Sequence, residues 1–283
     1  MYTLVVKNKY GQELELTHNN AYAITSIEGL DPPDATINTT KNANTDGSEF
    51  NSSYLDNRQI IITMAINSPA ESNRINLYRF FKSKMPVTLF YKNSSRNVYI
   101  TGYVKKPTIE FFNKKQIAQI VIDCLNPYFI NLKNNEDTIS SIVAQFEFPF
   151  SVAADGVELS TITEDPVETL NVGDDETGAK FTIHATGTIE NPTLYNETTN
   201  EQMTVNVTLT DGEELIINTE TRNKSAIIVK PDGTIVNAVG LINPGSTWLK
   251  LVPGVNSLQL LSDGAYTLDG YVLLDFNAKF EGV

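Results

Sequence analysis

The fold is decided by residues 97–129, NVYITGYVKKPTIEFFNKKQIAQIVIDCLNPYF. Polar and apolar residues alternate along residues 98–112 and again along residues 116–125, on either side of the polar break at residues 113–115. A period of two is typical of half-buried β-strands, so this stretch predicts a long β-hairpin with a short turn. The hairpin ends before Pro127, because proline has no amide hydrogen to donate to a ladder. We interpret it as the last element of a first module and the hinge to a second.

Length and charge support two modules. The chain has 283 residues, enough for two domains of ordinary size. Residues 1–140 hold 15 Lys/Arg and 13 Asp/Glu, a net of +2, whereas residues 141–283 hold 6 and 21, a net of −15. The acidic second half argues against nucleic-acid binding, which needs clustered Lys and Arg. The single cysteine, Cys124, excludes an internal disulfide and fits a reducing cytoplasm. We expect neither a signal peptide nor a membrane span.

The first module is predicted to be antiparallel β with one packed helix. Strands are expected at residues 2–7, 13–16, 22–27, 59–67 and 87–91. The helix is expected at residues 69–83, with Ser68 as its N-cap. Ile75, Tyr78 and Phe81 mark its apolar stripe, which Leu77 and Phe80 widen. Its basic residues, Arg74, Arg79, Lys82 and Lys84, favour a solvated face or an acidic neighbour over nucleic acid.

Residues 31–57, DPPDATINTTKNANTDGSEFNSSYLDN, are the unusual part of this module. They contain few large apolar residues, and Asp46-Gly47 is a hairpin-turn signal. A polar stretch of this length inside a compact domain is often a functional or interaction segment. It predicts either an extended arm or a plain surface loop.

After a polar linker at residues 132–137, the pattern is entirely β. Turn signals separate short strands without an intervening helix, which is typical of a β-sandwich. The strands are expected at residues 139–146, 180–185, 193–196, 203–209, 214–218, 226–230, 234–238, 248–251, 257–261 and 271–276. The predicted domains are therefore residues 1–131 and 138–283.

Signals for catalysis are sparse. The two histidines, His18 and His184, fall in different predicted domains, and no His-x-His or Cys-x-x-Cys spacing indicates a metal site. Cys124 ends an apolar strand and is interpreted as a core residue. The turn GDDETG at residues 173–178 offers oxygen ligands suited to Ca²⁺, although its spacing does not match an EF-hand loop. No catalytic residue, metal or cofactor is predicted.

Aromatic residues of the second domain leave a binding role open. Trp248, Tyr266 and Tyr271 are candidates for a platform that stacks on glycans of the host cell wall. The alternative is that they fill the core of the sandwich.

Five features follow one another along the first half of the chain. They are IEGL at residues 27–30 before the polar arm, the Asp46-Gly47 turn, LYRFF at residues 77–81, YITGYV at residues 99–104 and DCLNPYF at residues 123–129. In this order they resemble the distal tail protein (Dit) family of long-tailed bacteriophages and prophage tails. In the second half, GTIENP at 187–192, GEELIINT at 212–219 and WLKLVPGVNSL at 248–258 look like the C-terminal domain of that family, a galectin-like or carbohydrate-module-like sandwich.

The resemblance implies a non-enzymatic structural hub in the virion tail, assembled in the bacterial cytoplasm. In that family six copies form a ring through their N-terminal domains, which joins the tail tube protein to the baseplate or tip hub protein and leaves a channel for DNA. The C-terminal domains project outward. Residues 31–57 become the candidate inter-subunit arm, with contact residues Asp31, Thr36, Asn44, Asp46, Gly47, Phe50 and Tyr54. The alternative function is an adhesion module that recognises a wall glycan. A hydrolase of wall polymer is disfavoured, because no catalytic motif supports it.

Overall fold

The computed structural model describes residues 2–110, 115–132, 135–139, 142–144, 160–162, 166–267 and 269–283. The chain divides into two compact units. Unit 1 comprises residues 1–133 together with 279–283, and unit 2 comprises residues 134–278. The fold is mainly β with one α-helix among the described residues, which confirms the predicted fold class.

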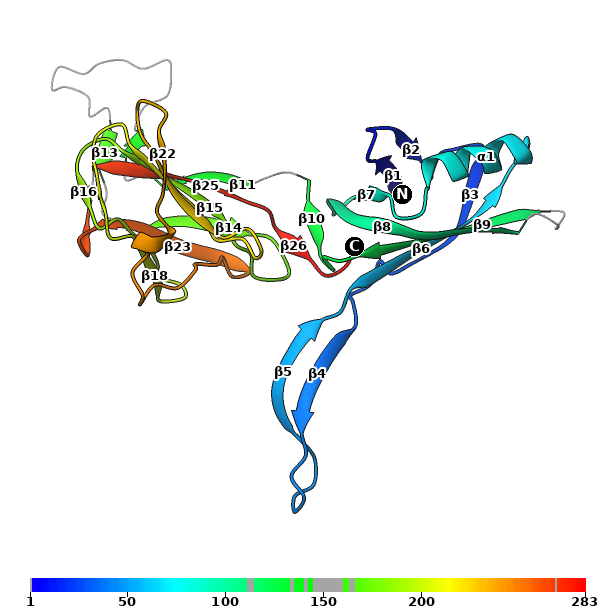
Figure 1. The fold of residues 1–283 in the computed structure, drawn as a ribbon, viewed down its shortest axis with the longest axis horizontal. Helices are drawn as coiled ribbons and strands as arrows, with labels where there is room; N and C mark the ends of the chain where they lie inside the picture. The colour runs from blue at the N-terminus through cyan, green and yellow to red at the C-terminus, as the bar shows by residue number, and fades with distance from the viewer. Residues whose placement is uncertain are drawn as a thin grey trace. The chain divides into compact units, whose positions relative to one another are not determined.

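Unit 1 is organised on one antiparallel sheet with the strand order β2-β1-β7-β8-β9-β6-β3 (Figure 1). Two short strands, β10 and β26, extend it beside β8. The strands are β1 (Thr3–Asn8), β2 (Glu13–Glu15), β3 (Tyr22–Glu28), β6 (Arg58–Ile66), β7 (Pro86–Lys92), β8 (Asn97–Glu110), β9 (Gln116–Cys124), β10 (Phe129–Asn131) and β26 (Lys279–Phe280).

The predicted long hairpin is the β8–β9 pair at the centre of this sheet. Alternate residues of each strand point into the core: Val98, Ile100 and Val104 from β8, and Ala118, Ile120, Ile122 and Cys124 from β9, each at most 1% exposed. Burial of a Val, Leu or Ile side chain stabilises a fold by about 1.5–3 kcal/mol. The period of two therefore sets which face of the sheet is covered. Residues 111–114, where the two strands connect, lie outside the described residues.

The helix α1 (Ala70–Phe80) buries only part of its predicted apolar stripe. Leu77 and Phe81 are fully buried, whereas Ile75 and Tyr78 are 38% and 40% exposed. Leu77 and Phe81, spaced four apart, share the buried face as expected, whereas Ile75 and Tyr78 lie to one side of it and are not core residues. Asn73 belongs to that buried face, and its Nδ2 donates to the Asn67 carbonyl at 2.9 Å. Ser68 does not cap the helix: Pro69 is the N-cap, without a side-chain hydrogen bond.

Unit 2 contains two larger antiparallel sheets. One has the order β11-β25-β15-β20-β21-β22, and the other has the order β14-β23-β17-β18 with β24 beside β23. Two small pairs, β12–β13 and β16–β19, accompany them. The strands are β11 (Asn135–Ile139), β12 (Ile142–Ala144), β13 (Ser160–Ile162), β14 (Val167–Asn171), β15 (Lys180–Ala185), β16 (Ile189–Glu190), β17 (Thr193–Asn196), β18 (Glu201–Thr204), β19 (Thr208–Leu209), β20 (Glu214–Asn218), β21 (Ser225–Val229), β22 (Ile235–Asn237), β23 (Gly254–Ser262), β24 (Ala265–Tyr266) and β25 (Gly270–Phe276). A 3-10 turn, η1 (Val239–Leu241), follows β22.

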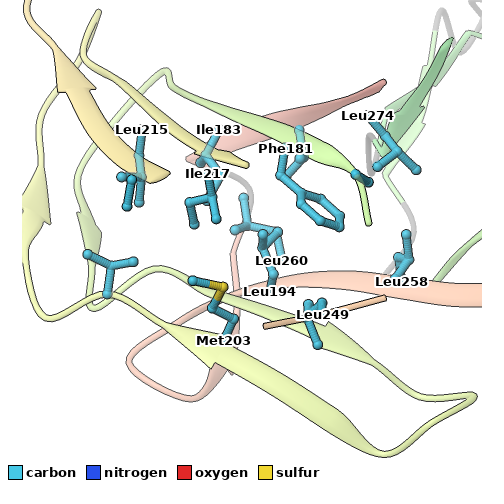
Figure 2. Packing of buried hydrophobic residues seen from close by; sticks show 14 of the residues in the cluster. Phe181, Ile183, Leu194, Met203, Leu215, Ile217, Leu249, Leu258, Leu260 and Leu274 are labelled. Carbon is cyan, nitrogen blue, oxygen red and sulfur yellow. The ribbon is translucent and has the colours of Figure 1, made fainter. Parts of the chain in front are cut away.

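The core of unit 2 lies between the two sheets (Figure 2). Phe181, Ile183 and Leu215 reach into it from the first sheet, and Leu194 and Met203 reach into it from the second. The alternation along β15 and β20 produces this inward face, as expected for a sandwich. Residues 248–251 do not form the predicted strand; Leu251 makes an isolated bridge to Thr177.

The end of the chain differs from the predicted domain division. Residues 138–283 were expected to form one domain, yet β26 pairs with β10 in unit 1, with Phe280 opposite Phe129. The apolar pair explains why so short a strand is held there: Phe129 and Phe280 are 1% and 5% exposed. Part of the strand predicted at residues 139–146 lies outside the described residues. Among the helices of the described chain, none has the length and apolar character to span a membrane.

Candidate subunit-contact site

The arm, residues 31–57, contains a two-stranded hairpin that leaves the sheet between β3 and β6 (Figure 1). Its strands are β4 (Ala35–Thr40) and β5 (Glu49–Leu55), which pair only with each other. The register places Ile37 opposite Ser53 and Thr39 opposite Phe50, with a bulge between Asn38 and Thr39. An isolated hairpin is marginally stable in water. This one therefore needs either its own polar contacts or a partner surface.

One face of the arm carries exposed apolar side chains. Ile37 and Phe50 are 63% and 66% exposed. Residues directly opposite in an antiparallel pair share a face, and side chains two apart on a strand do as well. Ile37, Thr39 and Phe50 therefore lie together on one face. Large apolar groups left in water on a projecting element are characteristic of an interaction surface.

The opposite face is polar and held by the arm's own hydrogen bonds. Asn38 Nδ2 donates to Ser52 Oγ at 3.1 Å, and Asn51 Nδ2 donates to Thr40 Oγ1 at 2.7 Å. Thr36 Oγ1 donates to Asp56 Oδ2 at 2.7 Å near the root. Tyr54, opposite Thr36, is 56% exposed on this face. These bonds pair polar groups of this face within the hairpin, whereas Ile37 and Phe50 on the other face remain largely exposed.

The predicted contact residues are spread along the arm. Asp31 lies at the root, Thr36, Phe50 and Tyr54 lie on the strands, and Asn44, Asp46 and Gly47 lie in the connecting segment at the tip. Gly47 has a φ of +89°, a backbone conformation that glycine adopts readily. The structure thus joins Thr36 and Tyr54 on one face and places Phe50 on the other. Their contact with a second subunit stays a prediction.

A buried arginine fastens the root of the arm. Arg58, the first residue of β6, is 3% exposed. Its Nη1 donates to the carbonyls of Gly29 and Asp31 at 2.8 and 2.7 Å, and its Nε donates to the Pro127 carbonyl at 2.7 Å. Its Nη2 donates to the Glu281 carbonyl. One side chain therefore links the start of the arm, the exit from β9 and the final residues of the chain.

The guanidinium is held by backbone carbonyls and by an aromatic ring. Its Cζ lies 4.7 Å from the Phe129 ring centroid, a favourable cation–π arrangement. Burial lowers the pKa of Arg58, while Cys124, Glu281 and Asp31 act in the opposite direction. An arginine stays charged in proteins even so. Burial likewise raises the pKa of the neighbouring Cys124 thiol to about 12, which keeps it neutral and unreactive.

Sequence reasoning missed Arg58, although a signal was present. Arg58 has the same parity as Ile60, Ile62 and Met64, all of which face the core. A cation on the buried face of a strand needs several acceptors around it. The periodicity could therefore have identified Arg58 as the centre of a polar cluster. It could not have identified the segments whose carbonyls accept its hydrogen bonds.

The last residues of the chain lie against the same root. The Val283 amide donates to the Leu30 carbonyl at 3.2 Å. The Arg96 guanidinium stacks over Phe280 at 3.8 Å, and Lys279 Nζ lies 5.6 Å from the Tyr128 ring centroid. The strand β26 and its flanks therefore brace the base of the arm.

Gly29 provides a test of how tightly this root is packed. Gly29 has a φ of +83°, and a Cβ there would lie 2.0 Å from the Gln59 carbonyl oxygen. Gly11 has a φ of +78° with nothing within 4 Å of its Cβ position, so it is a matched control. Both alanine variants carry the left-handed backbone cost of about 1–2 kcal/mol. We expect Gly29→Ala to lower the free energy of unfolding by about 1–3 kcal/mol more than Gly11→Ala, because of the added overlap. Equal losses in urea unfolding would contradict the close packing.

The three sugar-stacking candidates lie in different segments of unit 2, each with its own neighbours. Tyr271 stacks on His184 at 4.8 Å, and His184 Nδ1 lies 3.0 Å from Glu214 Oε1 on the outward face of the first sheet of unit 2. Trp248 packs against the core and lies under Lys224, which follows the other end of β20. Tyr266 lies on β24, beside β23. Tyr271 thus lies beside His184, which pairs with Glu214 at the start of β20, whereas Trp248 lies beside Lys224, which follows the end of that strand. Glycan stacking by these residues stays a prediction.

Other candidate chemical sites have structural partners. In the turn at residues 173–178, Asn171 Oδ1 accepts from the Gly173 amide, and Glu176 is paired with Lys250. Within the described part of the chain, no three His, Cys, Asp or Glu side chains gather where they could hold a metal.

His18 lines an open cleft of about 720 Å³ in unit 1, whose walls include Tyr2, Tyr22 and Asn67. Burial raises the pKa of Tyr22, whose hydroxyl donates to the Asn73 carbonyl at 3.0 Å.

Family comparisons match both units. The family model for the phage tail protein RIFT-related domain matches residues 9–124. The model for the C-terminal domain of siphovirus-type tail components matches residues 172–277. Fold and sequence together define a phage tail component. The chain belongs to the distal tail protein (Dit) family of long-tailed phages, and its place is the distal tail of the virion.

Solved structures share the fold. The crystal structure of the SPP1 Dit protein (gp 19.1), described as a paradigm of the hub adsorption apparatus in phages that infect Gram-positive bacteria, matches with a TM-score of 0.66 and 12% identity over 99% of each chain. A chain of the phage P2 baseplate in its activated conformation with Ca matches with a TM-score of 0.50 and 11% identity over 100% of each chain. No curated protein sequence matches this one.

Proposed function

We propose that this protein is a ring-forming hub, in which six copies join the tail tube to the baseplate or tip and enclose a channel for DNA. The observation that carries the proposal is the arm, whose Ile37 and Phe50 side chains are left in water by the chain itself. An arm that contacts a different surface on the next copy is a heterologous interface. Repeated under cyclic symmetry, such an interface closes into a ring.

The partners follow from the same role. A ring at this point of the tail contacts a tail tube protein on one side and a tail tip or baseplate hub protein on the other. Assembly of the ring would take place in the bacterial cytoplasm, in keeping with one buried cysteine and no disulfide. The role is structural and not catalytic.

The test is the solution mass of the full chain by light scattering, with negative-stain images of the same peak. We expect a species of six times the 31.3 kDa chain mass, with a central hole. A monomer at every concentration, including after addition of purified tail tube protein, would overturn the ring. Saturable binding of such a monomer to wall glycan would support the adhesion alternative instead.

A further inference from the structure

Charge is segregated within unit 1. The arm carries five carboxylates against one lysine, a net of −4: Asp31, Asp34, Asp46, Glu49, Asp56 and Lys41. The other residues of 1–133 carry 14 Lys/Arg against 6 Asp/Glu, a net of +8. An acidic projection on a basic body creates electrostatic complementarity between copies, because the arm of one chain is attracted to the body of another.

One surface of the body combines this positive charge with exposed apolar groups. We call it the helix patch: Lys9, Tyr10, Ile75, Tyr78, Arg79 and Lys82. Tyr10 is 62% exposed, and its ring centroid lies 4.9 Å from Lys9 Nζ and 5.8 Å from Lys82 Nζ. Ile75, Tyr78 and Arg79 share one face of α1 at helical spacing. Lys82 follows the C-cap residue Phe81 and lies over the Tyr10 ring, so the C-terminal end of α1 is next to the β1–β2 turn.

The cations of the helix patch have no carboxylate partner among the described residues. Neighbouring cations do: Lys7 Nζ lies 3.2 Å from Glu13, and Arg74 lies 3.5 Å from Glu71. Lys9, Arg79 and Lys82 form no such ion pair in the described chain. The patch therefore offers uncompensated positive charge beside exposed Tyr and Ile side chains.

We propose that the helix patch is the seat of the arm of a second copy, an inference that rests on the proposed ring. Phe50 and Ile37 pack against Tyr78 and Ile75, while Asp46, in the connecting segment at the tip of the arm, faces Arg79 and Lys82. The arm does not occupy the helix patch of its own chain, because its tip extends well away from α1 (Figure 1). The contact is heterologous, as ring closure requires.

Charge reversal tests the electrostatic half of this contact in the full chain. We expect Arg79→Glu with Lys82→Glu to raise the concentration needed for assembly by more than about ten-fold, since like charges across an interface are strongly unfavourable. Adding Asp46→Lys, at the tip of the arm, should restore part of the assembly. Lys105→Glu with Lys106→Glu, an equal charge change on β8, is the matched control and should have little effect. Rings that tolerate the helix-patch reversal would overturn the seat but leave the ring proposal intact.

A cysteine pair tests the same contact without relying on ring closure. Phe50→Cys with Tyr78→Cys should form disulfide-linked oligomers on mild oxidation, and the native Cys124 will not interfere because it is fully buried. Phe50→Cys with Tyr103→Cys, whose tyrosine is also exposed, is the control. If the wild-type chain forms no ring, disulfide-linked oligomers of the Phe50→Cys, Tyr78→Cys variant are measured at its highest soluble concentration. Absence of a linked dimer there overturns the seat by itself.

Discussion

Replacement of residues 35–55 by a short glycine–serine linker is expected to abolish ring assembly and leave a folded monomer. The strands β4 and β5 pair only with each other, and nearly all of their side chains are exposed. Their removal takes nothing from the core of unit 1, so the free energy of unfolding should change by no more than about 1 kcal/mol. Light scattering measures the first effect and urea unfolding the second. Intact rings from this variant would refute the role of the arm.

Point variants separate the two faces of the arm. Ile37→Ser with Phe50→Ser removes the apolar face, and we expect it to weaken assembly strongly, because exposed apolar anchors dominate the energy of most interfaces. Asn38→Ala with Ser52→Ala removes one internal hydrogen bond on the polar face and should weaken assembly much less. The reverse order would assign the contact to the polar face.

The second large effect is expected at Arg58. Arg58→Met removes the donors of four hydrogen bonds, to the carbonyls of Gly29, Asp31, Pro127 and Glu281. A hydrogen bond to a charged group contributes about 1.5–3 kcal/mol, so we expect the free energy of unfolding to fall by more than about 3 kcal/mol. Arg58→Lys keeps the charge but cannot reproduce the planar fork, and its loss should be intermediate.

The measurement at Arg58 combines urea unfolding with hydrogen exchange. Amide protection should fall first at residues 29–31 and 281–283, where the acceptors lie, while that of β8 and β9 persists to the global transition. Arg79→Met, on the exposed face of α1, is the control and should change stability by less than about 0.5 kcal/mol. A stability loss at Arg58 no greater than this control would show that the cluster does not hold the root.

The regular elements could be predicted because their determinants are local. The alternation in β8 and β9 predicted a hairpin, and it formed because each strand has one face to bury. The same pattern predicted the sandwich strands around Phe181, Leu215 and Leu274. The helix was predicted at the right place, and Leu77 and Phe81 were among the apolar residues expected on its stripe. The predicted stripe was too broad, because only packing against the rest of unit 1 selects Leu77 and Phe81 for burial over Ile75 and Tyr78.

The order of the amino acids is enough to predict a mainly β fold with one helix and a polar arm of residues 31–57, and it carries the resemblance to phage distal tail proteins. The folded structure was needed to show that the arm is a hairpin with one apolar face, and that Arg58 joins its root to Pro127 and Glu281. The folded structure also shows that β26 pairs with β10 in unit 1, and that Tyr271 stacks on His184 while Trp248 lies beside Lys224. The difference lies in how far apart along the chain the contacting residues are. Periodicity reports on residues that are close in the sequence, whereas these features depend on residues that come together only after folding.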